Sequence, residues 1–235
     1  MARITLASYN VHWSRDKQGR PFDAVEVCRA LDADVVALQE SWLPDGEKSD
    51  ADRAAAELGY TVSHSVMGRG RVTGRRPRLC PEAVAQGTLV VSLLSRLPVV
   101  ATEVQDLRVM PMDTAPRRLA VHADIDVDGE RFTYVVTHLD HLSHGSPVQL
   151  RQLVRRLPGP DRPTALAGDM NMWGPLLSLQ MPGWSRAVRG RTWPRPRPHS
   201  QIDHIMVNRA VRPVDWAVLQ AGRSDHLPVR ATVSF

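Results

Sequence analysis

Short apolar runs that end in polar side chains recur along this chain, and they constrain its fold more than any other feature. The clearest is LAGDMNMWG (166–174), in which Asp169 and Asn171 follow small apolar residues that end in Gly168. Because side chains alternate along a β-strand, residues two apart lie on one side, and we expect Asp169 and Asn171 to face the same ligand. A turn or a helix cap uses the same residue types, so the motif alone leaves both interpretations open.

Similar polar residues close apolar runs from the beginning of the chain to its end. They are Asn10 after ITLASY, Glu40 after VVALQ, His138 after YVVT, Asp203 in QIDHI, and Asp225 with His226 before the final run. Each has a structural explanation when taken alone, as a capping, solvated or turn residue. As a set, they predict a single site at which several strand ends meet.

The periodicity of the apolar residues predicts alternating strands and helices, which is typical of an α/β fold. Helices are expected at 22–34, 50–59, where Gly59 stops the helix, and 147–157. Strands are expected at 3–11, 34–41, 60–66, 88–95, 98–107, before the GDMN motif, and at 202–208, 214–220 and 227–235. Residues 117–139 predict a hairpin, because Asp128-Gly129 is a strong turn signal between two alternating segments.

The length and the hydrophobic content favour one domain. A chain of 235 residues, 43% of them hydrophobic, is long enough to bury one sizeable core. No internal repeat and no linker-like segment divides it. We therefore expect a single catalytic domain over residues 1–235.

The charge is basic and comes almost entirely from arginine. The formal net charge is +5, and Lys17 and Lys48 are the only lysines. Two arginine-rich stretches, RGRVTGRRPR (69–78) and SRAVRGRTWPRPRPHS (185–200), contain Gly or Pro and lack periodicity, so we expect surface loops. A basic balance favours an anionic partner, and the two stretches gain importance if they flank one site.

The cysteines and the first residues indicate a chain of the cytoplasm. Cys28 lies in a helical pattern and Cys80 in a Pro- and Arg-rich stretch, without metal-ligand spacing between them. The start MARITLASYNV enters a strand-like run without the features of a signal peptide, and no apolar run has membrane-spanning length. We expect reduced thiols, a monomer, a cytoplasmic location and no stable membrane insertion.

The order of the motifs resembles the endonuclease/exonuclease/phosphatase superfamily, which includes DNase I-like nucleases, abasic-site endonucleases, sphingomyelinases and inositol-polyphosphate phosphatases. The resemblance runs through SYNVHW, LQES, SLLSRLPV, VTHLDH, LAGDMNM, QIDHIMV and SDHLPV. GDMN and SDHLPV are the most specific, and RTWPRPRPHSQIDHI resembles a pattern of smaller bacterial members. The resemblance implies a four-layer α/β sandwich, in which two mixed sheets pack face to face between helices.

The resemblance also implies a Mg²⁺-dependent phosphoesterase site, with Mn²⁺ as a possible substitute. Glu40 would be the main metal ligand, Asn10 would orient a metal ligand or Asp169, and Asp225 would contact the metal side of the site. The catalytic set would be Asp169 for the attacking water, Asn171 as a donor to phosphoryl oxygen, His138 for the phosphate or leaving group, and Asp203 orienting His226. His226 would act as a base or stabilise transition-state charge.

The chemistry explains these residue types independently. A phosphodiester is anionic and repels hydroxide unless a cation neutralises it, and hard Mg²⁺ prefers carboxylate and amide oxygens. In-line attack needs an oriented water and donors for the phosphoryl oxygens, which a carboxylate, an amide and imidazoles supply. A carboxylate that accepts a hydrogen bond from a histidine sets the tautomer and favours the charged imidazole.

One position of the family pattern stays unassigned. Some nucleases of the family place a glutamate beside the histidine that corresponds to His138. Here Glu82 and Gln86 are the candidates for that partner, since Val90 stands where the nearby strand often has glycine.

Three alternatives remain at this stage. THLDHLSHG (137–145) partly resembles the zinc motif of metallo-β-lactamase-fold enzymes through His138, Asp140 and His141, but Val136 stands at the first histidine. A non-catalytic nucleic-acid-binding module on the same fold would use the arginine-rich loops alone. Among phosphoesterases, the charge favours DNA or RNA as substrate, whereas Trp173, Trp184 and Trp193 keep a small or lipid phosphoester open.

Overall fold

The computed structural model describes residues 1–73, 76–113 and 115–235. The first half contains β1 (Arg3–Asn10), α1 (Ala24–Leu31), β2 (Val35–Pro44), α2 (Asp50–Leu58), β3 (Thr61–Thr73), β4 (Arg76–Leu79), β5 (Gly87–Ser95) and β6 (Val99–Leu107). The second half contains β7 (Arg118–Val127), β8 (Glu130–His138), α3 (Gly145–Val154), β9 (Thr164–Asp169), α4 (Gly174–Gln180), β10 (Ser185–Arg186), β11 (Asp203–Val207), β12 (Arg212–Val218) and β13 (Val229–Ser234).

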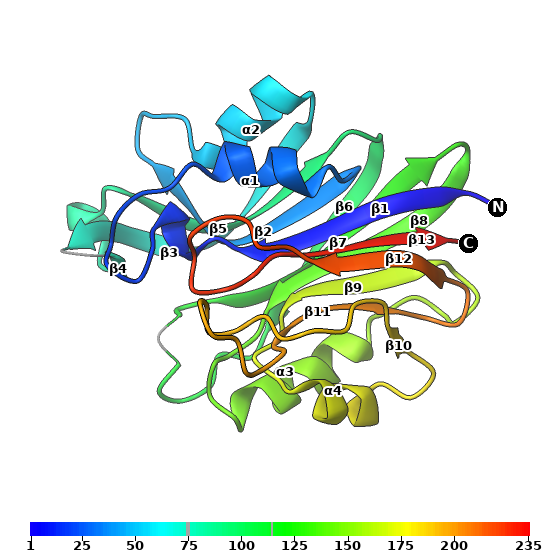
Figure 1. The fold of residues 1–235 in the computed structure, drawn as a ribbon. Helices are drawn as coiled ribbons and strands as arrows, with labels where there is room; N and C mark the ends of the chain where they lie inside the picture. The colour runs from blue at the N-terminus through cyan, green and yellow to red at the C-terminus, as the bar shows by residue number, and fades with distance from the viewer. Residues whose placement is uncertain (74–75, 114) are drawn as a thin grey trace.

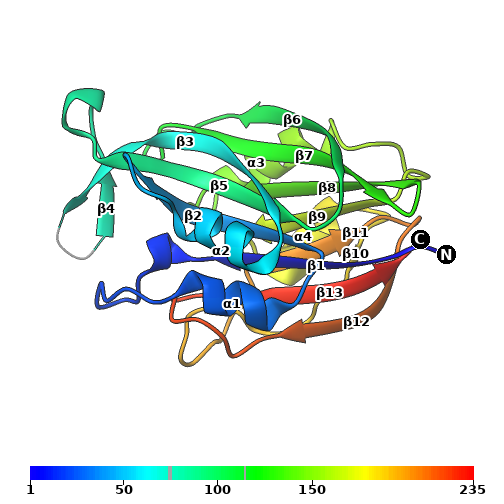
Figure 2. The same cartoon turned by 90° about the horizontal axis from the view of Figure 1, so that it is seen from above.

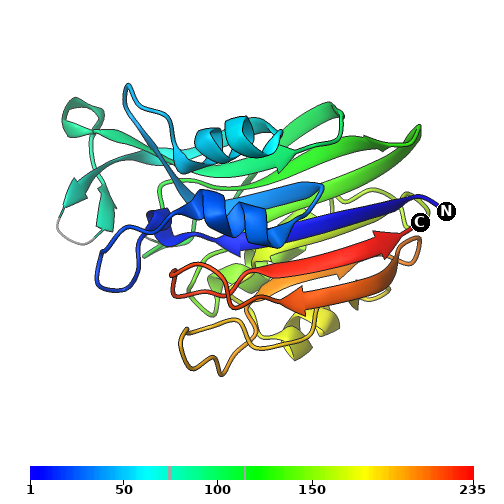
Figure 3. The ribbon, with the colours of Figure 1, turned by 45° about the horizontal axis from the view of Figure 1, so that its top comes forward.

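The strands form two sheets that pack face to face (Figure 1). One has seven strands in the order β12-β13-β1-β2-β5-β3-β4, and the other has six in the order β10-β11-β9-β8-β7-β6. Each sheet mixes parallel and antiparallel neighbours, since β1 pairs parallel with β2 and β8 parallel with β9. Helices α1 and α2 lie on the outer face of the first sheet (Figure 3). The predicted four-layer sandwich is confirmed.

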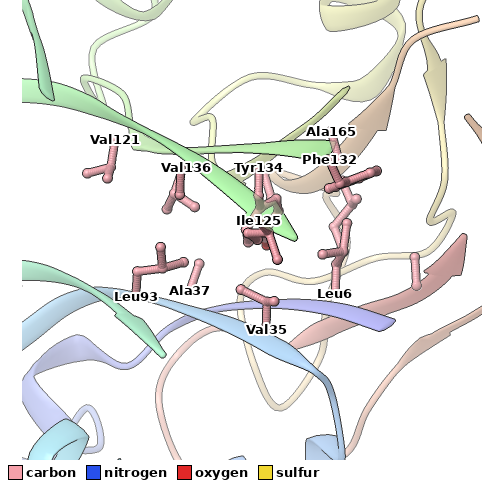
Figure 4. Packing of buried hydrophobic residues seen from close by; sticks show 14 of the residues in the cluster. Leu6, Val35, Ala37, Leu93, Val121, Ile125, Phe132, Tyr134, Val136 and Ala165 are labelled. Atoms are coloured by element: carbon pink, nitrogen blue, oxygen red, sulfur yellow. The ribbon is translucent and has the colours of Figure 1, made fainter. Parts of the chain in front are cut away.

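Three apolar layers hold this arrangement together. The largest lies between the sheets, where Leu6 and Val35 of one sheet meet Phe132 and Tyr134 of the other (Figure 4). A second layer joins the outer face of the seven-stranded sheet to α1 and α2, and a third joins the six-stranded sheet to α3 and α4. Burial of such apolar surface is the main favourable contribution to folding.

Local sequence signals set several of the element boundaries. Ser49 and Asp52 form a reciprocal capping box at the start of α2, and Gly59 ends that helix in the left-handed conformation. Asp128 and Gly129 both have positive φ between β7 and β8, as a tight hairpin turn requires. The predicted hairpin and helix end are therefore confirmed.

Several predicted boundaries were wrong. The strand predicted at 60–66 continues as β3 to Thr73, and β4 pairs with it, so the described part of 69–78 is a β-hairpin arm and not a loop. Residues 74–75 of that stretch lie outside the described residues. The helix predicted at 147–157 runs from Gly145 to Val154. The strand predicted at 34–41 continues to Pro44, because β2 pairs with β5 again from Ser41 to Pro44 after an irregularity.

The two parallel strand pairs determine where polar strand ends meet. In the first sheet β1 ends at Asn10, the register partner of Gln39 next to Glu40 on β2. In the second sheet β8 and β9 end beside each other, where His138 is the register partner of Asp169. β11 begins at the same place, because Asp203 is also a register partner of Asp169. These ends lie opposite the chain termini, which Figure 2 places together at the far end of the sheets. In the described part of the chain, no helix is long and apolar enough to span a membrane.

Candidate active site

The structure brings all the predicted site residues to one end of the sandwich. Asn10, His138 and Asp169 end strands β1, β8 and β9, Asp203 begins β11, and Glu40 lies within β2. Asp225 and His226 lie in the loop before β13. That loop is tied to β1, because Ser224 Oγ donates to the carbonyl oxygen of Asn10 at 2.7 Å.

Asn10 joins two carboxylates from different sheets. Its Nδ2 donates to Glu40 Oε1 at 3.2 Å and to Asp169 Oδ2 at 3.1 Å, and its Oδ1 accepts from His12 N at 3.0 Å. Asn10 is 1% exposed, so these bonds are made out of contact with water. An amide held in this way positions both carboxylates at once.

Glu40 lies at an irregularity in its strand. Its φ is 52°, in the left-handed region, and the register of β2 against β5 shifts between Leu38 and Ser41. Such bulges re-aim side chains, and non-glycine residues in this region carry strain that concentrates at functional sites. Oε2 of Glu40 is buried and has no hydrogen-bond partner among the described residues.

Asp169 is the most contacted carboxylate of the site. Its Oδ1 accepts from Asn171 N at 3.0 Å, and its Oδ2 lies 3.6 Å from Nε2 of both His138 and His226. Burial, the largest effect, raises the pKa of Asp169, while the His226 charge and the Asn10 donor lower it, and the result is about 7. A carboxyl group that titrates near neutrality can accept a proton from water and release it again.

His226 is held by Asp203. Nδ1 of His226 lies 3.0 Å from both carboxylate oxygens of Asp203, which is 1% exposed. Burial, the largest single effect, lowers the pKa of His226, but the charges of Asp203, Asp169 and Asp225 together raise it to about 10. At neutral pH His226 is therefore an imidazolium, which favours charge stabilisation over the role of a base.

The pKa of His138 is shifted in the opposite direction from that of His226. Burial lowers its pKa well below the ordinary value, and the nearby positive charges of Arg118 and His226 lower it further. Its Nε2 lies 3.6 Å from Asp169 Oδ2 and 3.9 Å from Glu40 Oε1, while its Nδ1 has no partner among the described residues. His138 is thus a neutral imidazole beside two carboxylates.

Asp225 faces both the histidine and a tryptophan. Its Oδ2 accepts from Trp193 Nε1 at 3.3 Å, and its Oδ1 lies 3.8 Å from His226 Nε2. Within the described chain, that Oδ1 is buried without a hydrogen-bond partner. Asp225 therefore has one oxygen fixed and one oxygen available to a ligand.

Asn171 lies at the site because of a turn, and not because of strand alternation as predicted. Strand β9 ends at Asp169, and Asn171 has a φ of 47°, so the two residues do not share the face of one strand. The turn at which Asn171 N donates to Asp169 brings the amide to the site, and Nδ2 also donates to Leu139 O at 3.0 Å. The turn interpretation is correct, and the turn leaves Asn171 at the lining of the cavity.

A cavity of about 910 Å³ opens over these groups. Glu40, His138, Asp169, Asn171, Asp225 and His226 line its polar end, whereas Asn10 and Asp203 lie behind them. Both arginine-rich stretches border it, through Gly70 and Arg78 of the first and Trp193 and Ser200 of the second. The two basic segments therefore flank one site.

The donor set fits a hard divalent cation. Glu40 Oε2 and Asp225 Oδ1 are buried, lack partners among the described residues, and belong to side chains that line the same cavity. Carboxylate oxygens are the ligands that Mg²⁺ prefers. Two compact groups of possible ligand atoms also occur in the described chain, Asp169 with Asp203 and His226, and Asp113 with Asp140 and His141. Hydrogen bonding explains the first, and Arg118 already neutralises Asp113 in the second.

Some residues of the site were missed or misassigned. Glu82 is not beside His138, because it accepts from Arg69 on the exposed arm, and Gln86 pairs with Gly70 through its backbone. Arg118 was not predicted, although its Nη1 donates to the carbonyl oxygen of His138 at 3.3 Å. Trp42 also lines the cavity and was not predicted.

The three predicted tryptophans and the polar residues of 137–145 lie in different parts of the structure. Trp193 lines the cavity, Trp173 is 61% exposed, and Trp184 packs on the layer under α4. His141 lines the cavity rim, and Asp140 Oδ1 accepts from Leu142 N at 3.0 Å before α3. The zinc motif of metallo-β-lactamase-fold enzymes lacks its first histidine here, because Val136 occupies that position and is buried in β8.

Comparisons with known proteins agree with this fold. The family model of the endonuclease/exonuclease/phosphatase family matches residues 7–226. No curated protein matches the chain. An endonuclease/exonuclease/phosphatase from Beutenbergia cavernae DSM 12333 is similar in structure, with a TM-score of 0.79, 21% identity, and coverage of 99% of this chain and 72% of that one.

Two further solved structures share the fold over nearly the whole chain. The mannosyl-6-phosphatase Bt3783 of Bacteroides thetaiotaomicron VPI-5482 has a TM-score of 0.70 and 17% identity, with coverage of 99% of this chain and 100% of that chain. The human Nocturnin catalytic domain with bound sulfate has a TM-score of 0.71 and 16% identity, with coverage of 100% and 94%. The chain belongs to the endonuclease/exonuclease/phosphatase family and is a phosphoric ester hydrolase.

Proposed function

We propose that this protein is a Mg²⁺-dependent phosphodiesterase that hydrolyses DNA or RNA by in-line attack of a water molecule. The observation that carries the proposal is the buried Asp169 carboxylate, which lies 3.6 Å from the Nε2 atoms of two histidines at the polar end of a cavity. A carboxylate and imidazoles at such separations are the groups that proton transfer and phosphoryl-charge stabilisation require. Residues 1–235 would form one catalytic domain.

Glu40 and Asp225 would hold the metal ion through their unpartnered oxygens, and Asn10 would orient Glu40. A bound Mg²⁺ neutralises phosphoryl charge and so admits a nucleophile. Mn²⁺ has a similar preference for oxygen ligands and would be expected to substitute.

Protein side chains would carry out proton transfer and charge stabilisation. Asp169, with a pKa of about 7, would take the proton of the attacking water. His226, charged because Asp203 supports it, would stabilise the negative charge that develops on the phosphoryl oxygens. Asn171 would donate its second amide hydrogen to the same oxygens, and neutral His138 would contact the phosphate or the leaving oxygen.

The charge around the cavity supports nucleic acid as the substrate. Arg78 lines the cavity, and exposed Arg71, Arg191 and Arg197 lie on the two segments that border it. Within the described chain these four arginines make no ion pair, whereas Arg69 of the same arm is paired with Asp45 and Glu82. Unpaired arginines beside a phosphoesterase site suit a polyanion. The proposed location is the cytoplasm, where cysteines such as the free Cys28 and Cys80 stay reduced, and the proposed enzyme is a monomer.

A turnover panel with Mg²⁺ tests the proposal. It would include plasmid DNA, single-stranded DNA, abasic-site duplex, RNA, phospholipids, phosphoinositides and a sugar phosphate. We expect cleavage of a nucleic acid that Asp169→Ala abolishes and that Asp161→Ala, an exposed aspartate in a loop, leaves unchanged. Turnover restricted to lipid or sugar phosphates would overturn the nucleic-acid assignment, while the same turnover by Asp169→Ala would overturn the assignment of the site.

A further inference from the structure

The cavity over the polar site has a second end that the proposed chemistry does not use. Trp42, Met67, Leu79 and Leu89 of the seven-stranded sheet line it, together with Ala115 from the segment before β7. All five side chains are apolar. The cavity thus combines a phosphate-binding end with an apolar wall, and about 910 Å³ is room for more than a phosphate group.

Trp42 lies on a flat backbone support within this wall. A Cβ atom at Gly87 would stand 2.5 Å from Trp42 Cζ2, and one at Gly70 would stand 3.5 Å from Cζ3. Gly70 and Gly87 are register partners on β3 and β5, so the absence of two side chains side by side makes room for the indole. Trp42 is partly exposed and lines the cavity, so the ring is supported by backbone and accessible to a ligand.

Trp42 is also close enough to the polar end to contact a group attached to a bound phosphate. It follows Glu40 by only two residues on β2, next to the irregularity at which Glu40 lies. Both side chains line the cavity, and therefore lie on one side of the sheet. A ligand can reach from the Glu40 carboxylate to the indole without leaving the cavity.

The charge at this end of the cavity favours a nucleotide over an acyl chain. Arg78 lines the cavity beside Leu79, is exposed, and makes no ion pair within the described residues. β4 and its end of β3 project at the left of Figure 1, so this arginine is carried on an arm beside the cavity. Arg78 and Trp42 line the same cavity. A cation and an aromatic ring in one groove are the combination that binds single-stranded nucleic acid, with the backbone on the cation and a base on the ring.

We propose that the apolar end binds one unpaired nucleobase next to the scissile phosphate, stacked on Trp42, so that the enzyme acts on single strands in preference to duplexes. The inference rests on the proposed function. A base in a duplex must first be unstacked and unpaired before it can enter a cavity, whereas a base in a single strand enters without that cost. Leu79, which is partly exposed, would contact the edge of the stacked base, while the buried Met67 and Leu89 form the apolar floor behind it.

The contact between Trp42 and the base is tested by removing the indole ring and the base separately and together. The substrate is a single-stranded oligonucleotide with one cleavable phosphodiester, and an abasic residue replaces the base on either side of it in turn. For the wild type, loss of the stacked base should lower kcat/KM by about 5- to 150-fold, the range given by base–aromatic stacking. For Trp42→Ala, the same loss should change kcat/KM less than twofold.

Matched variants separate stacking from folding. Trp42→Leu keeps an apolar side chain over both glycines and removes the ring, so it should behave like Trp42→Ala, whereas Trp42→Phe should retain most of the base dependence. Trp216 is 47% exposed on β12, outside the cavity, and Trp216→Ala should respond to the abasic residue as the wild type does. Binding of the uncleaved oligonucleotide to Asp169→Asn, measured by fluorescence anisotropy, gives the same comparison without turnover.

Other outcomes would contradict the stacking site. Equal losses in the wild type and in Trp42→Leu, or duplex cleaved as fast as single strand, would overturn the stacking site while the nuclease proposal stands. Lysophospholipid turnover that depends on Trp42 and not on any base would assign the apolar end to an acyl chain. If no nucleic acid is bound or cleaved, both the inference and the proposed function fail.

Discussion

Nδ1 of His226 lies 3.0 Å from both carboxylate oxygens of Asp203, and both side chains are buried. Asp203 begins β11 and His226 precedes β13, so the pair joins the six-stranded sheet to the loop that leads into the seven-stranded sheet. The contact keeps His226 protonated, with its Nε2 3.6 Å from Asp169 Oδ2. The proposed charge stabilisation depends on this pair.

Asp203→Asn should lower kcat by about 10²-fold or more, since an oriented proton-transfer or charge-stabilising group contributes at this scale. The substitution removes a negative charge, so the pKa of His226 should fall from about 10. NMR titration of the His226 ring checks the pKa, and Asp215→Asn on the exposed edge strand β12 is the matched control. A normal kcat together with a lowered pKa would show that the imidazolium has no role in turnover.

Glu40→Gln should weaken Mg²⁺ binding by about 10- to 100-fold, a loss typical of groups that hold or orient a metal. Glu40 Oε2 is buried without a partner among the described residues, and an amide there binds a hard cation less well than a carboxylate. Isothermal titration with Mg²⁺ in the absence of substrate measures the change. Glu47→Gln, exposed after β2, should bind as the wild type does, and equal affinity in Glu40→Gln would remove Glu40 from the metal site.

Gly168→Ala should lower the free energy of unfolding by about 2–4 kcal/mol. Gly168 has a φ of +141°, and a Cβ atom there would collide with the carbonyl oxygen of Thr137 on the neighbouring strand. At Gly159 a Cβ atom would meet nothing within 4 Å, so Gly159→Ala should change stability by less than about 0.5 kcal/mol. Urea denaturation of the two variants compares them, and equal stabilities would contradict the close approach of β8 and β9.

His204 should make the protein less stable in acid. Burial, the largest effect, lowers its pKa to about 4, although its contacts with the carbonyl oxygens of Met172 and Gln201 favour the proton. The unfolded chain takes up a proton below pH about 6.5 and the folded chain only near pH 4, so stability is full above 6.5 and falls between these values. The loss from this group is on the order of 3 kcal/mol.

His204→Gln keeps a side-chain donor and cannot titrate, so its stability should vary less between pH 7 and pH 4 than that of the wild type. Urea denaturation at several pH values measures the difference, with His144→Gln, an exposed histidine before α3, as the control. If the two variants have the same pH dependence, His204 does not carry the effect.

The sequence predicted the fold well where local patterns decide the structure, and it predicted which polar residues lie together. Gly59 at the end of α2 and the Asp128-Gly129 turn are local signals, and both formed as expected. The predicted polar residues lie together because the parallel pairs β1–β2 and β8–β9 place Asn10 beside Gln39, next to Glu40, and His138 beside Asp169.

Features that depend on distant partners were not predictable in the same way. Glycines in 68–70 interrupt the alternation of β3, yet the strand continues because β5 pairs with it from Thr61 to Gly70. The Arg118–Asp113 pair, the Trp42 support and the two bonds from Asn10 Nδ2 join residues whose proximity only the folded chain establishes.

The most direct measurement of the central claim is the single-turnover cleavage rate of an oligonucleotide by wild type and by Asp169→Asn, with Mg²⁺ and with a chelator. Asn has nearly the shape of Asp but cannot take a proton from water, so we expect a loss of about 10²–10⁴-fold, and no cleavage by either protein in chelator. Cleavage by folded Asp169→Asn at the wild-type rate, or equal rates with and without Mg²⁺, would contradict the account.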